Sequence, residues 1–112
     1  MKIAIPMADG QLCMHFGHCE AFAIVTVDDQ DNKIVGTEML TPPAHEPGVL
    51  PRWLGEQGAD VILAGGMGQR AQQLFVQNGV KVVVGVAGGT AEELVTAYLG
   101  GTLQAGDNIC DH

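Results

Sequence analysis

Soft metal donors crowd into one short segment near the amino end of the chain. Residues 13–19 read Cys-Met-His-Phe-Gly-His-Cys, so two thiols and two imidazoles lie within seven positions. Thiolate and imidazole are the usual protein ligands of zinc, copper and iron, and cysteine also holds iron–sulfur clusters. The spacing lacks the Cys-x₂-Cys knuckle of a structural zinc finger. The segment therefore predicts a soft-metal or metal–sulfur site and leaves its nuclearity open.

The C-terminal tail repeats part of this pattern. One residue separates Cys110 from His112, just as one residue separates Cys13 from His15. We interpret the two Cys-x-His pairs as matching chelating arms. The alternative is that the cysteines only pack, as single buried thiols often do, and that the tail is a frayed terminus. The candidate metal ligands are Cys13, His15, His18, Cys19, Cys110 and His112.

The hydrophobic pattern of the chain predicts an α/β domain, and its strands and helices must position these donors. Apolar runs at 2–6, 21–27 and 33–40 are typical of strands, and the polar residues 28–32 predict an antiparallel hairpin between the last two. Beyond the proline-rich segment 41–48, helical and strand-like segments alternate, which favours parallel pairing. The helices are expected at 49–58, 69–79 and 90–101, and the strands within 60–68 and 80–89. We expect one domain over residues 1–112, with five strands in a mixed sheet, helices on its faces and a polar tail from about residue 104.

Glycine-rich turns follow the last two expected strands, at 65–68 and 86–90. Ligands of open α/β sheets bind beyond the carboxyl ends of the parallel strands. If the first strand lies among them, its Cys/His segment reaches the same edge. Backbone N–H groups at helix N-termini can hold an anion there without a cationic side chain. The candidate cofactor-binding residues are Gly65, Gly66, Met67, Gly68, Gly88 and Gly89.

The composition and motifs of the chain argue against several kinds of partner and against catalysis. The chain carries five Lys or Arg against thirteen Asp or Glu, a formal charge of −8, which disfavours nucleic acid and anionic membrane surfaces. It has no apolar run long enough to span a bilayer and no signal-peptide pattern. Three cysteines, an odd number, favour a reducing cytoplasm. No nucleophile elbow, Walker loop or HExxH motif is present, so we expect no enzyme.

The chain resembles the dinitrogenase iron–molybdenum cofactor biosynthesis family over nearly its whole length. The resemblance rests on "MKIAIPMADG", "HFGHCEAF", the proline/histidine segment, "ADVILAGGMGQRAQQLF" and the glycine turn before "TAEELV". That family includes NifX- and NafY-like carriers and the C-terminal part of some NifB proteins. It implies a three-layer, ribonuclease H-like α/β/α fold with a five-stranded sheet in the order 3-2-1-4-5, strand 2 being antiparallel.

The resemblance also implies a function. Such proteins bind or carry a metal–sulfur cluster or its precursor, iron–sulfur or molybdenum-containing, in the cytoplasm, and exchange it with a donor or acceptor protein. The family's HFG histidine corresponds to His15, and its glycine turn to Gly65, Gly66 and Gly68. The residues leave three alternatives open. These are a thiol-based redox protein using Cys13 and Cys19, a single-ion site of the zinc type, and a nucleotide-binding module using only the glycine turns.

Overall fold

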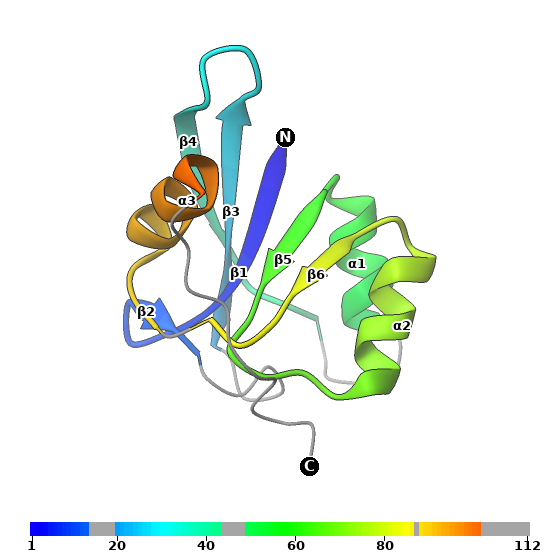
Figure 1. Cartoon of the computed structure of the whole chain (residues 1–112). Helices are drawn as coiled ribbons and strands as arrows, with labels where there is room; N and C mark the ends of the chain where they lie inside the picture. Colours follow the sequence, from blue (N-terminus) through cyan, green and yellow to red (C-terminus); the bar gives the residue numbers. More distant parts are fainter. Residues whose placement is uncertain (14–19, 44–48, 87, 102–112) are drawn as a thin grey trace.

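The computed structural model describes residues 1–13, 20–43, 49–86 and 88–101. Three helices and six strands alternate along them (Figure 1). The strands are β1 (Lys2–Ala8), β2 (Gln11–Leu12), β3 (Ala21–Asp28), β4 (Lys33–Leu40), β5 (Val61–Leu63) and β6 (Lys81–Val83). The helices are α1 (Val49–Glu56), α2 (Gln69–Gln77) and α3 (Ala91–Gly100). None of these helices is long and apolar enough to cross a membrane.

The strands form one mixed sheet in the order β4-β3-β1-β5-β6, with β2 paired to β1 alone. β3 is antiparallel to both β1 and β4, whereas β5 is parallel to β1 and β6 is parallel to β5. This confirms the expected hairpin, the parallel pairing in the second half of the chain and the order of the five expected strands. The expected count of five is wrong, because β2 is a sixth strand.

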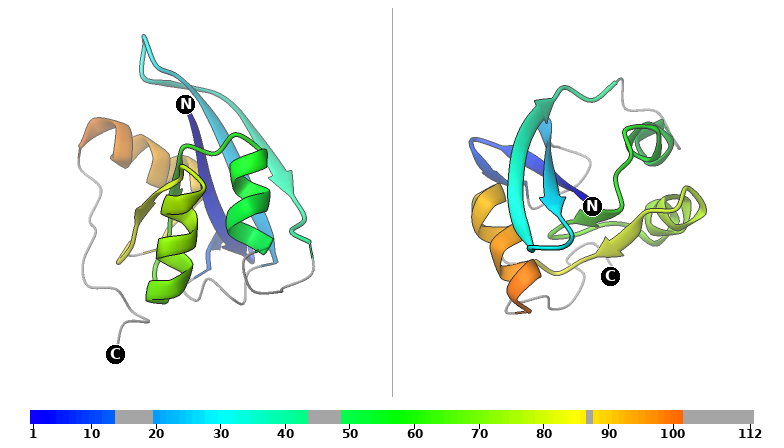
Figure 2. Two further views of the ribbon diagram at one scale, coloured as in Figure 1. Left: turned by 90° about the vertical axis from the view of Figure 1, so that its right-hand side faces the viewer. Right: turned by 90° about the horizontal axis from the view of Figure 1, so that it is seen from above.

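Helices cover both faces of the sheet, so the fold has three layers. On one face, α1 and α2 bury Leu50, Leu54 and Phe75 against Phe22 and Ile24 of β3. On the other face, α3 buries its own apolar side chains against the opposite side of the same strands. The alternation follows from the two-residue period of a strand, which sends neighbouring side chains to opposite faces. Figure 2 shows α3 separated from the other two helices by the sheet.

The first strand runs past Pro6, although we expected it to end there. Proline has no N–H and is normally excluded from a strand with neighbours on both sides. Here β5 pairs with β1 only at Ile3 and Ala4. The Pro6 carbonyl accepts from Cys13 N at 2.8 Å, and the missing N–H points to that same side, away from β3. The proline therefore removes no bond from the β1–β3 ladder.

The short strand β2 exists because the chain reverses tightly at Asp9 and Gly10. Both residues have positive φ, 55° and 77°, as the two central residues of a type I′ hairpin turn require. The turn pairs Ala8 with Gln11 and Met7 with Leu12. An Asp-Gly dipeptide after a strand is a recognised hairpin signal, so this strand was open to prediction.

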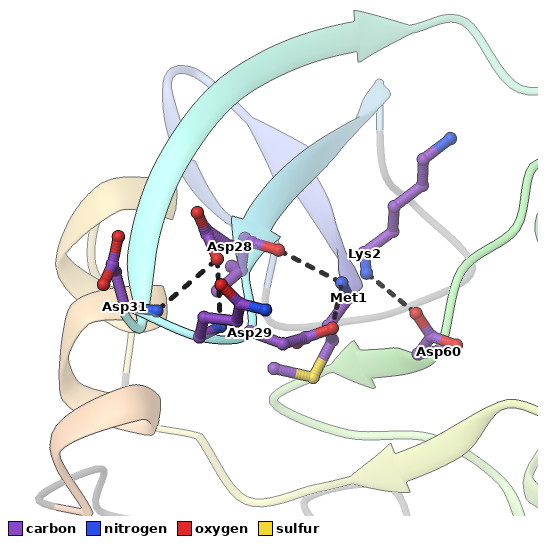
Figure 3. A network of polar contacts seen from close by, with 8 residues as sticks. Met1, Lys2, Asp28, Asp29, Asp31 and Asp60 are labelled. Atoms are coloured by element: carbon purple, nitrogen blue, oxygen red, sulfur yellow. Dashed lines mark hydrogen bonds and ion pairs between the residues drawn. The ribbon is translucent and has the colours of Figure 1, made fainter.

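The opposite end of the sheet is held by polar contacts around the chain start (Figure 3). Asp60 accepts from Lys2 N at 2.8 Å through Oδ2, and its own backbone N–H donates to the Lys2 carbonyl at 2.8 Å. The Asp60 carbonyl also accepts from Lys81 N at 2.9 Å. One residue thus aligns the beginnings of β1, β5 and β6. The Met1 amino group binds Val27 O and Asp29 Oδ2, both at 3.1 Å.

Candidate functional site

Because β1, β5 and β6 are mutually parallel, the segments that follow them meet at one edge of the sheet. We call this the loop edge, made of the described residues 9–13, 64–68, 84–86 and 88–89. It is the lower edge in Figure 1. β4 runs parallel to β1, since both are antiparallel to β3, so residues 41–43 begin at the same edge.

Backbone hydrogen bonds join these segments directly. Leu12 N donates to Gly89 O at 2.8 Å, which connects the segment after β1 to the turn before α3. Gly85 N donates to Gly65 O at 2.9 Å, and Val86 N donates to Ala64 O at 3.1 Å. The three loops therefore form one connected backbone surface, as the sequence predicted.

Only some of the predicted glycines lie at the surface of this edge. Gly65 and Gly66 are buried, whereas Gly68 and Gly88 are exposed and Gly89 is half-buried. Gly88 and Gly89 have φ of 82° and 138°, so their backbone conformation itself requires glycine. Gly68 has an ordinary φ of −64°, and a Cβ there would meet nothing within 4 Å. Neither backbone conformation nor packing among the described residues requires glycine at position 68.

The two helices that begin at the loop edge differ at their N-termini. Thr90 caps α3 through a capping box with Glu93, as the sequence predicted, and Glu92 and Glu93 place acids in its first turn. α2 begins after Gly68 with no side-chain cap hydrogen bond and no acid in its first turn. The first N–H groups of a helix need partners outside the helix, and the helix dipole attracts negative charge to them. The N-terminus of α2 is therefore the one suited to an external anion.

Arg70 strengthens this contrast. It is exposed in the first turn of α2, where a cation is unfavourable next to the positive end of the helix dipole. No salt bridge within the described residues involves it. A bound anion would offset both the dipole and this charge. In the sequence, Arg70 follows the 65–68 glycine turn by two residues, a position from which it could face a bound anion, although a solvated side chain is the usual role of an arginine on a helix.

The two soft side chains of the loop edge that the structure describes are buried. Cys13 is 9% exposed and Met67 is 1% exposed, and both pack in the core between α1, α2 and the sheet. The Met67 carbonyl accepts from Gln72 Nε2 at 2.9 Å. Cys13 lies beneath the loop edge, and its backbone N–H donates to the Pro6 carbonyl. Met67 belongs to the buried layer under the exposed glycines, which we call the floor of the edge.

The remaining predicted metal ligands, His15, His18, Cys19, Cys110 and His112, lie outside the described residues. Within the described ranges, no group of three or more His, Cys, Asp or Glu side chains is arranged to hold a metal ion. An open groove of about 740 Å³ lies between α2 and β6, but it contains none of the loop-edge residues. The described part of the site is thus a backbone surface with one adjacent cation.

A natural reporter lies on the same side of the sheet. Trp53 is the chain's single tryptophan, and its ring meets Phe22 edge-on at a centroid distance of 5.8 Å. Phe22 pairs with Pro6 in the β1–β3 ladder, and Pro6 bonds the backbone of Cys13. A short chain of contacts therefore links the loop edge to the surroundings of Trp53.

These features define a small three-layer α/β domain whose parallel strands deliver glycine-rich loops to one edge. The sequence model of the family described as "Dinitrogenase iron-molybdenum cofactor" matches residues 1–101. The chain belongs to this family, as the sequence motifs predicted.

The chain is also similar to individual proteins and solved structures. The protein MJ0580 of Methanocaldococcus jannaschii is 32% identical over 85 residues, which cover 73% of this chain and 72% of MJ0580. The crystal structure of PH0822 is similar with a TM-score of 0.84, 31% identity and 94% coverage of both chains. The apo form of the orange protein from Desulfovibrio gigas has a TM-score of 0.71 and 26% identity, over 96% of this chain and 93% of that one.

Proposed function

We propose that this protein is a carrier that binds a metal–sulfur cluster, or a precursor of one, as cargo at the loop edge and catalyses no reaction. Family membership supports a role in cofactor binding or biosynthesis. We further propose that the cargo is an iron–sulfur or molybdenum-containing cluster and that the fold is ribonuclease H-like. The single domain works in the cytoplasm, where a donor and an acceptor protein exchange the cargo with it.

The observation that carries the proposal is the contrast between α2 and α3. Both helices start at the loop edge, yet α3 satisfies its own N-terminus with Thr90 and acids. α2 offers exposed Gly68, a first turn without acids, and Arg70. Metal–sulfur clusters bound by thiolates are anionic, and N–H donors to their sulfur atoms are among the means by which proteins tune them. An anionic cluster resting on α2 would satisfy these donors in a chain of net charge −8.

The donor set fits such a cargo. Thiolates and imidazoles supply direct metal bonds, which are strong enough to offset the repulsion between an acidic chain and an anionic cluster. We assign the metal-binding role to the set predicted from the sequence, namely Cys13, His15, His18, Cys19, Cys110 and His112. Gly68, Gly88 and Gly89 supply the backbone surface, over the buried floor of Gly65, Gly66 and Met67.

The first test is elemental analysis with a UV–visible spectrum, on untagged protein purified anaerobically and then incubated with ferrous iron and sulfide. We expect stoichiometric iron or molybdenum, acid-labile sulfide and charge-transfer bands. Colourless protein with stoichiometric zinc would replace the cluster with a single-ion site. Protein without metal after reconstitution would overturn the carrier function.

Cysteine variants then assign the thiolates. We expect Cys13→Ala, Cys19→Ala and the double variant to bind less metal, with the double variant losing most of it. Because Cys13 is buried in the core, its variant is also measured by thermal unfolding, which separates loss of a ligand from loss of packing. Full metal retention in the double variant would exclude both thiolates as ligands.

Charge reversal tests the role of α2. Arg70→Glu places an acid in the first turn, which should stabilise the free protein by about 0.3–1 kcal/mol through the helix dipole and weaken cluster retention. Lys81→Glu makes the same change in net charge at the start of β6, at the other end of the sheet. Equal cluster loss in the two variants would mean that only overall charge matters and would remove α2 from the site.

A further inference from the structure

The strand β6 ends the sheet on the side opposite β4, and helix α2 lies beside it (Figure 1). β6 pairs only with β5. The open groove of about 740 Å³ runs between α2 and β6. Val76, Val80 and Val82 supply its apolar lining, which glutamines of α2 and Lys81 complete. Val76 is 65% exposed, so the described part of the chain leaves this groove open to solvent.

The outer edge of β6 presents one pair of backbone groups to solvent. Lys81 N donates to Asp60 O at 2.9 Å, and Val83 O accepts from Ala64 N at 2.9 Å, so Lys81 and Val83 face β5. Successive residues of a strand turn their backbone groups to opposite edges. The N–H and C=O groups of Val82 therefore face the open edge, beside the groove. Such groups are the template on which an extended peptide adds as a further strand.

The charges around the groove indicate what kind of peptide fits it. Residues 61–91 contain two cations and no Asp or Glu, although the chain carries thirteen acids in all. One of the two cations is Lys81, which is exposed at the start of β6. The acid that precedes this stretch, Asp60, accepts from Lys2 N at 2.8 Å through its carboxylate. An acidic segment can therefore enter the groove without facing a carboxylate of α2 or β6.

We propose that the groove between α2 and β6 is a docking site for an acidic, extended segment of a partner protein, which adds to β6 as an outer antiparallel strand. Antiparallel pairing is the more stable arrangement per residue. The partner residue opposite Val82 exchanges two backbone hydrogen bonds with it, and its side chain lies on the same face as Val82, toward α2. The next partner residue lies opposite Lys81. An apolar residue flanked by acids is the pattern that matches both positions.

A second copy of this chain is a poorer occupant than an acidic segment. Pairing β6 with β6 of another copy would bring together two faces whose described charges are cations, Arg70 and Lys81. Like charges on opposed surfaces repel each other, and each copy also carries a net charge of −8. An acidic segment meets the opposite sign at Lys81, and screening over about 8 Å at physiological salt weakens its repulsion by the more distant acids.

The test uses a short peptide and metal-free protein, so its result is independent of the proposed cargo. Fluorescein-labelled Gly-Glu-Val-Glu-Gly is titrated with the protein and followed by fluorescence anisotropy. One pair of backbone bonds with few side-chain contacts supports weak binding, and we expect saturation with a Kd below about 1 mM. Gly-Lys-Val-Lys-Gly should bind roughly 3- to 10-fold more weakly, because it opposes like charges. N-methylation of the central valine removes its N–H donor and should weaken binding by a similar factor.

Matched substitutions locate the site on the protein. Lys81→Glu should weaken binding of the acidic peptide roughly 3- to 10-fold. Lys33→Glu makes the same change in net charge on β4, at the opposite edge of the sheet, and should have little effect. Val76→Glu adds an acid to the groove and should weaken binding, whereas Val35→Glu changes a valine that is similarly exposed, at 68%, on β4 and should leave binding unchanged.

Several outcomes would overturn the proposal. Anisotropy that does not saturate up to about 1 mM protein would exclude docking of an acidic segment. Equal weakening by Lys81→Glu and Lys33→Glu would show that only overall charge matters. Unchanged affinity of the N-methylated peptide would exclude strand addition. A dimer in sedimentation velocity that Val76→Glu abolishes would assign the groove to a second copy instead of a partner.

Discussion

Leu12 and Gly89 lie far apart in the chain, yet the Leu12 N–H donates to the Gly89 carbonyl at 2.8 Å. This bond ties the segment after β1, which leads into the Cys/His cluster, to the turn that precedes α3. It requires Gly89 to keep a φ of 138° and Gly88 a φ of 82°. The position of β2, which leads into residues 13–19 in the sequence, thus depends on the conformation of a distant glycine turn.

The first prediction concerns this turn. Gly88→Ala forces a side chain into left-handed backbone, which costs about 1–2 kcal/mol, although its Cβ would meet nothing within 4 Å. We expect the free energy of unfolding in urea to fall by that amount. Gly36→Ala is the matched control, because Gly36 has open space and no left-handed φ. Equal effects of the two substitutions would contradict the conformational explanation.

The second prediction separates stability from binding at Gly68. Serine is at least as good an N-cap as glycine, so Gly68→Ser should leave the stability of the free protein unchanged or raise it slightly. Its hydroxyl would occupy the N–H groups of α2 that we assign to the cluster. We expect weaker cluster retention, followed by the charge-transfer bands and by Trp53 fluorescence. Unchanged retention in this variant would show that the cluster does not rest on α2.

The third prediction concerns pH. Hydrogen bonds from the Thr90 side chain and then from the Thr90 backbone lower the pKa of Glu93 below its ordinary value of 4.5. A lowered folded-state pKa contributes stability above the unfolded value and loses it as the pH falls through the folded value. The difference in unfolding free energy between the wild type and Glu93→Gln should therefore be constant at neutral pH and shrink below pH 4.5.

Thr90→Ala provides the control for that measurement. It removes the N-cap of α3, at a cost of about 1 kcal/mol, together with the side-chain hydrogen bond that most lowers the pKa of Glu93, whereas the bond from the backbone N–H of residue 90 remains. In the Thr90→Ala background, Glu93→Gln should show a weaker pH dependence. An unaltered pH dependence would mean that the capping box does not hold the Glu93 carboxylate.

The fourth prediction compares two aspartates at the far end of the sheet. Asp60→Ala removes the acceptor of Lys2 N and should lower stability by about 0.5–1.5 kcal/mol. Asp29→Ala breaks only a surface ion pair with the Met1 amino group, whose Asp29 side chain is 70% exposed, so its effect should be smaller. High salt should abolish the Asp29 effect by screening and leave most of the Asp60 effect. Equal effects with equal salt dependence would refute this distinction.

Much of this protein was determined by local patterns in its sequence. The hairpin at 28–32, the strand–helix alternation after residue 49 and the capping box of Thr90 and Glu93 all depend on residues close together in the chain. Such patterns act through backbone conformation and through the period of apolar side chains, so they can be read without the fold. The motifs also identified the family and the soft donors that make a metal cargo the leading proposal.

Only the tertiary structure decided what each loop-edge residue can do. Pro6 continues β1 because β5 pairs with β1 no further than Ala4, a fact of sheet register. Gly65, Gly66, Met67 and Cys13 became floor and core, while Gly68 and Arg70 remained at the surface. Burial depends on contacts between segments distant in the chain, so the local sequence did not determine which residues of these glycine-rich loops would be covered.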